Sequence, residues 1–426
     1  MLLMKICLAN DSFPPQIDGV VNVVINYAER LNEKYGSAMV AAPRYPDVTD
    51  DYSFPVVRYK SFDTVKSMGY RTGYPFSHAA MKQLTEFAPD VIHSHCPMAS
   101  TFLARELREL TDAPLILTYH TKFDIDIRRL IKMKFLHETA IRQMVLNIEA
   151  CDEVWAVNKG AGENLKSLGF SGDYVIMKNG VDFTNCPASE TALHALNQEY
   201  NLPTDGTPVF LFVGRILWYK GIRIFLDSLR DLKTLGKDFR MVFVGRGDDE
   251  EEIKAYISAL HLEQNCIFVG PVYDRERLKA FYTRADLLFL PSVFDNDPLV
   301  VKEAAAAHTA SVLIQDSSAA DGVTHGLDGL LIEENAESMT KILLPVLENP
   351  SMMQAMGEKA SENLYLSWDD SVAKAVARYE YLLQKYPKGS KTHPKARYSK
   401  AISWIGDMYR ASQKLKKLTS KSNNKQ

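Results

Sequence analysis

The sequence predicts an α/β protein with two Rossmann-like domains, each a doubly wound parallel sheet, which face each other across a cleft. Short apolar runs alternate with longer segments of helical periodicity, and this alternation is typical of parallel sheets covered by helices on both faces. The alternation stops and begins again near residue 208. A length of 426 residues provides enough chain for two cores of ordinary size.

Five apolar runs in the first half of the chain predict buried strands, with helix-length segments between several of them. These strands are expected at residues 4–9, 38–42, 90–93, 115–118 and 153–157, and two of the helices at 20–35 and 99–110. A second series of runs predicts strands at 208–213, 240–244, 266–269, 286–290 and 311–314. Because doubly wound domains bind ligands outside the carboxyl ends of their strands, the ligand site is expected at those ends, in the cleft.

The same alternation sets the expected domain boundaries. A first domain over residues 1–182 is followed by a linker over 183–207, in which two prolines and a glycine interrupt regular structure. The second domain covers residues 208–360. A helix over 361–384 is expected to pack back on the first domain, and residues 385–426 are expected to form a basic, amphipathic helical tail.

The composition is that of an ordinary soluble globular protein: 46% of the residues are hydrophobic, 24% are charged, and the net charge is −3. No run of about 18 uncharged apolar residues predicts a membrane span. The short apolar start, residues 1–10, is expected to be a strand rather than a signal peptide. The five cysteines are scattered without zinc-type spacing. We therefore expect a cytoplasmic protein with reduced thiols and no nucleic-acid partner.

Charge is spread unevenly along the chain. From residue 385 onward there are twelve Lys and Arg residues and one acid, Asp407. Apolar side chains recur at helical spacing in this tail, and a second basic-apolar run covers residues 128–135. Basic amphipathic helices suit the headgroup region of an anionic membrane. We therefore expect peripheral contact with the inner face of the cell membrane; the alternative is a tail that is solvated or packs on the protein.

A helix start after residue 297 offers a phosphate site. Asp297 is expected to be its N-cap, followed by a proline, which is favoured at the first helical position. The free N–H groups of Leu299 and Val300 would then point into the cleft and bind phosphate. Asp295 and Glu303, before the helix and along its first turns, could bind hydroxyls at either end of a sugar nucleotide. The alternative is a capped surface helix with two solvated acids.

Two cations are expected near the same phosphate. A buried strand ends at Gly214 and Arg215, and Lys220 follows at a helix start. Arg and Lys side chains that converge there could neutralise a diphosphate, although two surface cations near a turn would have the same pattern. In the N-terminal half, Gly19 lies in a loop between a strand and a helix, where it would allow the backbone close to a phosphate or sugar.

Together these stretches resemble glycosyltransferase family four, over residues 5–383. The matching motifs are a pair of acids with seven residues between them, a basic pair, an Asn-Gly-Val-Asp turn and a strand that ends in histidine. In this chain they are Asp295 with Glu303, Arg215 with Lys220, residues 179–182, and residues 117–121 with His120. The order of the motifs along the chain is more specific than any one of them.

This resemblance implies the GT-B fold and a retaining glycosyltransferase that moves a hexose from a UDP- or GDP-linked donor to a hydroxyl acceptor. It implies an acceptor site in the first domain and a donor site in the second. Arg215 and Lys220 would contact the diphosphate and Glu303 the ribose, with His120 near the reacting sugar and Asp295 among the catalytic groups. It implies neither a metal ion nor a cofactor. The acceptor is expected to be a membrane lipid or lipid-linked glycan, with a soluble sugar or polysaccharide as the alternative.

Three departures from the family pattern bear on the identity of the donor sugar more than on the reaction class. The first acid of the pair, usually Glu, is Asp295 here, Asp18 stands where the N-terminal loop often has its first glycine, and Asp321 stands where a Glu often occurs. One alternative function is that of a nucleotide-sugar epimerase of the same fold, which would need no acceptor. Another, which Asp295 leaves open, is a catalytically inactive nucleotide-sugar-binding protein.

Three weaker signals have simpler interpretations. His93 and His95 share one side of a predicted strand, but no further ligand is evident nearby, so we place His95 with His120 on the acceptor side rather than at a metal. The Asp-X-Asp stretches at 124–126 and 295–297 predict no metal site, because that motif needs a single-domain transferase fold. The glycines of residues 245–247 lack the third glycine of a dinucleotide loop, and five acids follow them.

Overall fold

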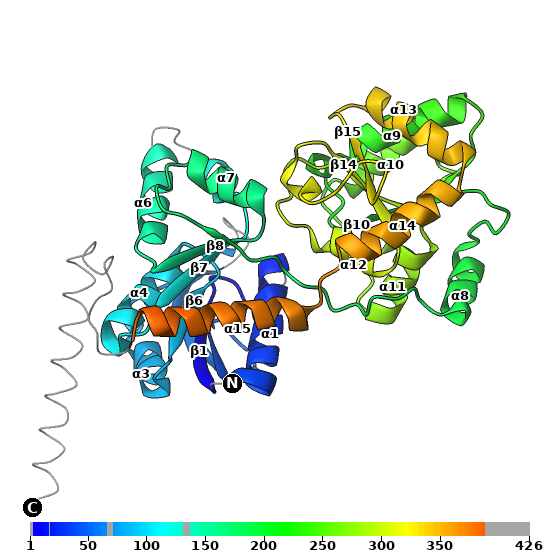
Figure 1. The fold of residues 1–426 in the computed structure, drawn as a ribbon. Helices are drawn as coiled ribbons and strands as arrows, with labels where there is room; N and C mark the ends of the chain where they lie inside the picture. The colour runs from blue at the N-terminus through cyan, green and yellow to red at the C-terminus, as the bar shows by residue number, and fades with distance from the viewer. Residues whose placement is uncertain (1–2, 17, 66–70, 131–136, 388–426) are drawn as a thin grey trace, which may run out of the picture. The chain divides into compact units, whose positions relative to one another are not determined.

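The computed structural model describes residues 3–16, 18–65, 71–130 and 137–387. The chain forms two compact units (Figure 1). Unit 1 comprises Met1–Lys178 and Ser371–Gln426, and unit 2 comprises Asn179–Asp370. Each unit is built around one parallel sheet with helices between its strands. This confirms the predicted class of two doubly wound α/β domains.

The sheet of unit 1 has the strand order β3-β2-β1-β6-β7-β8-β9, and every pair is parallel. The strands are β1 (Met4–Ala9), β2 (Gly36–Pro43), β3 (Val56–Tyr59), β6 (Val91–Ser94), β7 (Leu115–Tyr119), β8 (Glu153–Ala156) and β9 (Val175–Ile176). The helices are α1 (Gly19–Arg30), α3 (His78–Phe87), α4 (Ala99–Thr111), α5 (Phe123–Leu130), α6 (His137–Glu149) and α7 (Lys159–Ser167). The chain order reverses at β1, between β2 and β6, which is where doubly wound sheets bind ligands.

The first predicted helix is shorter than expected. The α-helix α1 ends at Arg30, and Leu31–Tyr35 form a single π-helical turn. Gly36 follows with a φ of 136°, and a Cβ at this position would lie 2.3 Å from the carbonyl oxygen of Met4. Glycine therefore lets the chain leave the turn and enter β2 directly beside β1. The strands β3 and β9 and the hairpin β4 (Ser61–Phe62) and β5 (Thr72–Gly73) are too short to give a clear periodicity.

The sheet of unit 2 has the order β12-β11-β10-β13-β14-β15, again parallel throughout. The strands are β10 (Val209–Val213), β11 (Arg240–Val244), β12 (Cys266–Gly270), β13 (Leu287–Leu290), β14 (Ala310–Ile314) and β15 (Gly329–Ile332). The helices are α8 (Glu190–Tyr200), α9 (Ile222–Thr234), α10 (Glu250–Ala259), α11 (Arg275–Arg284), α12 (Leu299–Ala306), α13 (Ala336–Glu348) and α14 (Ser351–Asn363), with 3₁₀ turns η3 (Trp218–Lys220) and η4 (Ser318–Ala320). The core is rich in phenylalanine; Phe210 stacks on Phe289 with ring centroids 4.5 Å apart.

The segment predicted as a linker, residues 183–207, belongs instead to unit 2. Phe183, Leu196 and Leu202 are buried in the core of that unit. The helix α8 lies in this segment, and Ser189 caps it by accepting a hydrogen bond from the Ala192 N–H. The prolines and the glycine that suggested a linker flank this helix: Pro187 precedes it, and Pro203 and Gly206 follow it.

The predicted helix over 361–384 is two elements. Residues up to Asn363 complete α14, and α15 runs over Trp368–Lys385. Ser367 starts the second helix, because its hydroxyl accepts a hydrogen bond from the Asp370 N–H. From Ser371 onward α15 belongs to unit 1, where the Tyr379 ring stacks on Trp155 with centroids 5.5 Å apart.

The predicted basic tail lies almost wholly outside the described residues, as does the basic-apolar run from residue 131. Among the residues that are described, no helix is both long enough and apolar enough to cross a membrane.

A buried acid on α4 makes the stability of unit 1 depend on pH. Glu106 is 4% exposed, and its Oε2 has no hydrogen-bond partner among the described residues. Burial raises its pKa from 4.5 to about 7. A raised carboxyl pKa means that the folded state holds its proton longer than the unfolded state does. The contribution of this group to stability is therefore complete below pH 4.5 and is lost as the pH rises through 7.

We expect Glu106→Gln to stabilise the protein at pH 8.5, because the amide cannot ionise. The gain in the free energy of unfolding should be on the order of 2–3 kcal/mol. At pH 5 the two proteins should be nearly equal in stability. Chemical denaturation at both pH values measures the difference; the same difference at pH 5 as at pH 8.5 would contradict the ionisation argument.

Candidate functional site

The end of β10 presents Arg215 to solvent. Gly214 follows the strand with a φ of 145°, and the exposed Arg215 side chain donates from Nη2 to the Tyr219 hydroxyl over 3.1 Å. The glycines after β11 pack directly against the backbone of this turn. A Cβ on Gly245 would lie 1.9 Å from the Gly214 carbonyl oxygen, and one on Gly247 would lie 2.1 Å from that of Ile216. Close backbone packing thus explains the glycine pattern of residues 245–247.

The 3₁₀ turn η3 brings Lys220 against the end of β13. Gly221 ends this turn with a φ of 78°, and a Cβ there would lie 1.8 Å from the carbonyl oxygen of Pro291. This approach sets Lys220 beside the loop that follows β13. Its Nζ lies 2.5 Å from Asp295 Oδ1, and both side chains are less than a fifth exposed. The structure therefore brings together two residues that the sequence motifs singled out separately.

Asp295 retains an unused acceptor. Its Oδ2 is buried and has no hydrogen-bond partner within the described part of the chain. A carboxylate paired through one oxygen can still accept a hydroxyl hydrogen bond through the other. The pair can thus present an ammonium to a phosphate oxygen and a carboxylate oxygen to a sugar hydroxyl.

The start of α12 differs from the prediction in its cap. Asp297 does not accept from the helix N–H groups; its Oδ2 accepts from Lys302 Nζ at 2.7 Å and from Asn179 Nδ2 at 2.9 Å. The helix begins at Leu299 without a side-chain cap. An ammonium and an amide from other turns thus occupy the oxygen that would have capped the helix. The first N–H groups, those of Leu299 and Val300, have no intrahelical acceptor and are suited to an anion.

Glu303 lies one turn further along α12 and is 7% exposed. Its Oε2 accepts from the Tyr282 hydroxyl at 2.7 Å, and its Oε1 accepts from Arg275 Nη2 at 2.8 Å. Both partners come from α11, seven residues apart on one helical face. Neither was predicted, because nothing in the sequence distinguishes them from other residues of an amphipathic helix. The carboxylate is held rigidly and retains lone pairs for a ligand hydroxyl.

In unit 1, His95 and His120 meet at the carboxyl ends of β6 and β7. His95 Nδ1 and His120 Nε2 are 3.0 Å apart, and the rings stack with centroids 5.3 Å apart. Burial lowers the pKa of His120 to about 3. Burial, followed by the neighbouring His93 and His120, also lowers the pKa of His95 well below its usual value. Both rings are therefore neutral near pH 7, and each can bind a hydroxyl without adding charge.

His93 has a structural environment. Its Nδ1 and Nε2 are each 2.7 Å from a hydroxyl oxygen, of Tyr379 and Thr118 respectively. Both ring nitrogens are thus occupied within unit 1. In the described residues no group of three or more His, Cys, Asp or Glu side chains could hold a metal ion.

Asp11 is a candidate that the motif analysis missed. It follows β1 and is 8% exposed; its Oδ1 accepts from the Ser100 N–H at 2.7 Å and from the Tyr59 hydroxyl at 3.3 Å. Its Oδ2 has no hydrogen-bond partner among the described residues, and the same holds for His95 Nε2. Burial raises the pKa of this carboxyl. The signal in the sequence was a polar pair directly after an apolar strand, at an edge where doubly wound sheets bind ligands.

Gly19 has no steric need to be glycine. It is exposed, and a Cβ there would meet no atom within 4 Å. Asp18 caps α1 by accepting from the Val21 N–H at 2.8 Å. Gly19 belongs to unit 1, whereas the other predicted donor-binding residues belong to unit 2.

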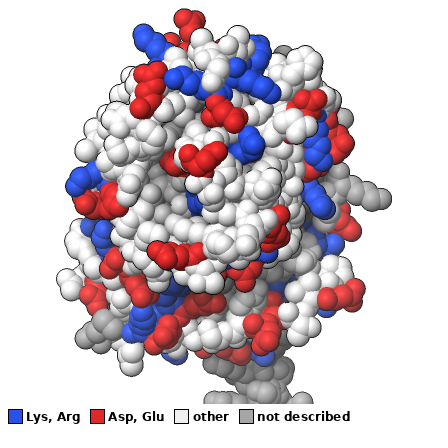
Figure 2. Space-filling view, turned by 90° about the vertical axis from the view of Figure 1, so that its right-hand side faces the viewer, with Lys and Arg blue, Asp and Glu red and all other residues white. Residues whose placement is uncertain are grey.

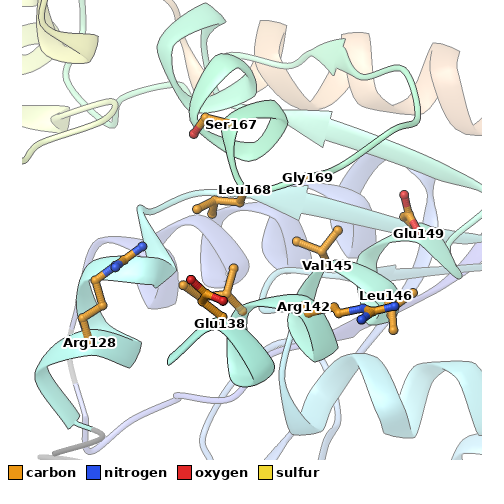
Figure 3. A pocket seen from close by; sticks show the side chains of 10 residues that line it. Arg128, Glu138, Arg142, Val145, Leu146, Glu149, Ser167, Leu168 and Gly169 are labelled. Atoms are coloured by element: carbon orange, nitrogen blue, oxygen red, sulfur yellow. The ribbon is translucent and has the colours of Figure 1, made fainter. Parts of the chain in front are cut away.

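Two surface features lie outside this constellation. Figure 2 shows acidic and basic side chains interspersed over the face that it draws, rather than a broad patch of one sign. A pocket of about 360 Å³ lies in unit 1 between α6 and α7 (Figure 3). Ile141, Val145 and Leu168 line it together with charged side chains that include Arg128 and Arg142. Arg128 belongs to the predicted basic-apolar run, but no predicted catalytic residue lines the pocket.

Two parts of the chain match known families. Residues 196–363 match the family described as "Glycosyl transferases group 1", and residues 17–185 match "Glycosyltransferase Family 4". A GDP-mannose-dependent alpha-mannosyltransferase of Corynebacterium glutamicum is 24% identical over 78% of this chain and 77% of its own length. An alpha-monoglucosyldiacylglycerol synthase of Streptococcus pneumoniae is 20% identical over 88% of this chain and 85% of its own length.

The fold also has solved counterparts. The crystal structure of Anabaena HepE in complex with UDP superimposes with a TM-score of 0.70 and 17% sequence identity. The match covers 89% of this chain and all of that one. This likeness extends over both units and shows that the two share a fold.

The approach of Gly221 to Pro291 generates a test of the site geometry. We expect Gly221→Ala to destabilise unit 2 by at least about 2 kcal/mol, because the new Cβ adds a clash to the positive φ. Gly206→Ala is the matched control: its φ is 93°, but a Cβ there meets nothing within 4 Å. The control should cost only about 1 kcal/mol. Denaturant unfolding compares the two, and equal losses would show that the close approach is not required.

Proposed function

This chain belongs to glycosyltransferase family 4, group 1, with the GT-B fold, and on that premise we propose that it moves a hexose from a nucleotide-sugar donor to a hydroxyl acceptor, with retention of anomeric configuration. The observation that carries this proposal is the Lys220–Asp295 pair, together with the exposed Arg215 side chain that donates to Tyr219 and the uncapped start of α12. These groups combine cations and free N–H donors for a diphosphate with a carboxylate oxygen for a sugar hydroxyl.

The chemistry needs stabilisation of the leaving group. As the glycosidic bond breaks, the sugar develops oxocarbenium character and negative charge grows on the diphosphate. Arg215 and Lys220 would stabilise that charge together with the N–H groups of Leu299 and Val300. In this proposal no metal ion is required. The acceptor hydroxyl attacks the face that the diphosphate leaves, and its proton passes to the departing phosphate.

The nucleoside would be held by Glu303. A carboxylate held in place by Tyr282 and Arg275 suits the vicinal hydroxyls of a ribose, which need two acceptors at a defined spacing. HepE was solved with UDP, and the Corynebacterium relative is named for GDP-mannose. We therefore propose a UDP- or GDP-linked hexose as the donor.

The acceptor would bind in unit 1, at Asp11, His95 and His120. The support is chemical: two neutral imidazoles and one carboxyl, with Asp11 Oδ2 and His95 Nε2 lacking hydrogen-bond partners within the described ranges. Buried polar atoms of this kind are usually satisfied in the working state. Hydroxyls of an acceptor would satisfy them.

We further propose that the acceptor is a lipid or lipid-linked glycan, reached by peripheral contact with an anionic membrane. The Streptococcus relative is named for a glycosylated diacylglycerol. Residues 388–426 carry eleven Lys and Arg residues against one acid. Each cation near an anionic surface adds on the order of 1 kcal/mol to binding.

We expect Arg215→Ala and Lys220→Ala each to lower kcat for transfer about 10²–10³-fold, by analogy with the loss of one oxyanion donor. Arg230→Ala is the matched control, because Arg230 is a half-exposed cation on α9 that pairs with Asp231. Product formation from a panel of UDP- and GDP-sugars measures the loss. Rates near wild type in both site variants would refute the proposed phosphate role.

The same assay tests whether transfer requires a metal ion. Transfer by the wild-type protein should continue at its full rate in excess EDTA. If EDTA abolishes transfer and Mg²⁺ or Mn²⁺ restores it, the cations of the protein do not replace a metal ion.

The membrane proposal is tested by co-sedimentation with vesicles. The full chain should bind phosphatidylglycerol-containing vesicles at low salt at least tenfold more strongly than a variant that ends at Pro387, because the variant lacks the basic segment. Binding should weaken at high salt, which screens exposed charges. Equal partitioning of the two proteins would show that the segment is not the anchor, and no binding by either would exclude peripheral contact.

A further inference from the structure

We propose that Asn179, Asp297 and Lys302 form a positioning network for the donor site. The network contacts neither the diphosphate nor the sugar; it holds the loop that carries Asp295 and the first turn of α12. The inference rests on the proposed function in that the loop is the proposed donor loop. The network itself can be tested without measuring turnover.

The three side chains close a ring of hydrogen bonds. Lys302 Nζ donates to Asp297 Oδ2 at 2.7 Å and to the Asn179 carbonyl oxygen at 3.0 Å. Asn179 Nδ2 completes the ring by donating to the same Asp297 oxygen at 2.9 Å. Asn179 is more than a hundred residues from the other two in sequence, so the ring is a tertiary contact and not a local turn.

The three residues of the ring are almost completely buried. The side chains of Asp297 and Lys302 are each 10% exposed, and Asn179 is 6% exposed. A buried pair of charges gains little net stability over an apolar pair, but loss of one partner leaves the other charge uncompensated. Such a pair therefore specifies one arrangement of its loop strongly.

The position of Asp297 explains what the ring controls. Asp295, whose carboxylate pairs with Lys220, lies two residues before it, and Leu299, the first residue of α12, lies two residues after it. The helix has no side-chain cap of its own. The Asp297–Lys302 pair therefore spans the junction between loop and helix and determines where the free N–H groups lie relative to Asp295.

The backbone next to Asn179 is held in place by the segment that leads into α15. A Cβ on Gly180 would lie 2.5 Å from the backbone nitrogen of Trp368. The Val181 N–H donates to the Leu366 carbonyl oxygen at 2.9 Å, and Val181 pairs with Ser367 in a parallel bridge. The first and last segments of unit 2 are thus bound to each other, and Asn179 joins the donor loop to both.

The test begins with hydrogen exchange of the unliganded protein. In Lys302→Met, amides of residues 179–182 and 291–300 should exchange at least tenfold faster than in wild type. Lys302→Arg, which retains the charge, should restore most of the protection. Lys341→Met, at an exposed lysine of α13, is the control and should change nothing. Unchanged exchange of these segments in Lys302→Met would overturn the proposal.

Turnover of UDP-glucose and GDP-mannose then separates positioning from a purely structural role. With the donor that wild type uses, Lys302→Met should lower kcat at least tenfold and raise KM less than threefold, well below its unfolding temperature. Faster exchange with an unchanged kcat would also overturn the proposal. If wild type uses neither donor, the proposed function fails. The exchange result alone then decides whether the network of Asn179, Asp297 and Lys302 holds the loop. Should Lys302→Met not fold, Asp297→Asn combined with Lys302→Met, which removes both buried charges, replaces it in both measurements.

Discussion

The candidate site in unit 2 depends on the approach of the Gly221 backbone to the carbonyl oxygen of Pro291. A side chain at position 221 would collide with that oxygen, so only glycine lets the turn after β10 contact the end of β13. This contact brings Lys220 to Asp295. The two strands are neighbours in the sheet, and their carboxyl ends therefore deliver a cation from one loop and an acid from the next to one place. The other candidate residues of unit 2 lie in the second of these loops and in α12, which follows it.

In unit 1, burial controls the charge of the candidate-site residues. His95 and His120 lie at the ends of fully buried strands, and desolvation keeps them neutral. The helix α15 contacts the neighbouring His93, because the Tyr379 hydroxyl binds the Nδ1 of that ring. A polar cluster in such surroundings has few alternative arrangements, since each unsatisfied group would carry a desolvation penalty. Unit 2 thus fixes its candidate-site residues through paired charges, whereas unit 1 does so through neutral polar groups.

Contacts that local sequence does not encode account for the differences between the predicted and the observed structure. Asp297 has the local signature of an N-cap, yet its carboxylate binds Lys302 and Asn179. Residues 183–207 have the breakers of a linker, yet Leu196 and Leu202 complete the core of unit 2. Arg275 and Tyr282 have no distinctive neighbours in sequence, and Asp11 is marked only by the polar pair that it forms with Asn10 directly after β1. Lys302 lies only five residues from Asp297, but the other decisive partners lie much further along the chain, where local propensity carries no information.

Local pattern by itself determined the parallel sheets, their restart after residue 208 and the positions of Gly214, Arg215, Lys220, Asp295 and Glu303 at strand ends and helix starts. These features depend on periodicity and on backbone rules that operate over a few residues. Only the tertiary structure decided which of these side chains meet. The Lys220–Asp295 pair, the grip of α11 on Glu303 and the His95–His120 contact all join separate crossover units of a sheet. Their geometry is set by strand order and close packing, which no window of sequence contains.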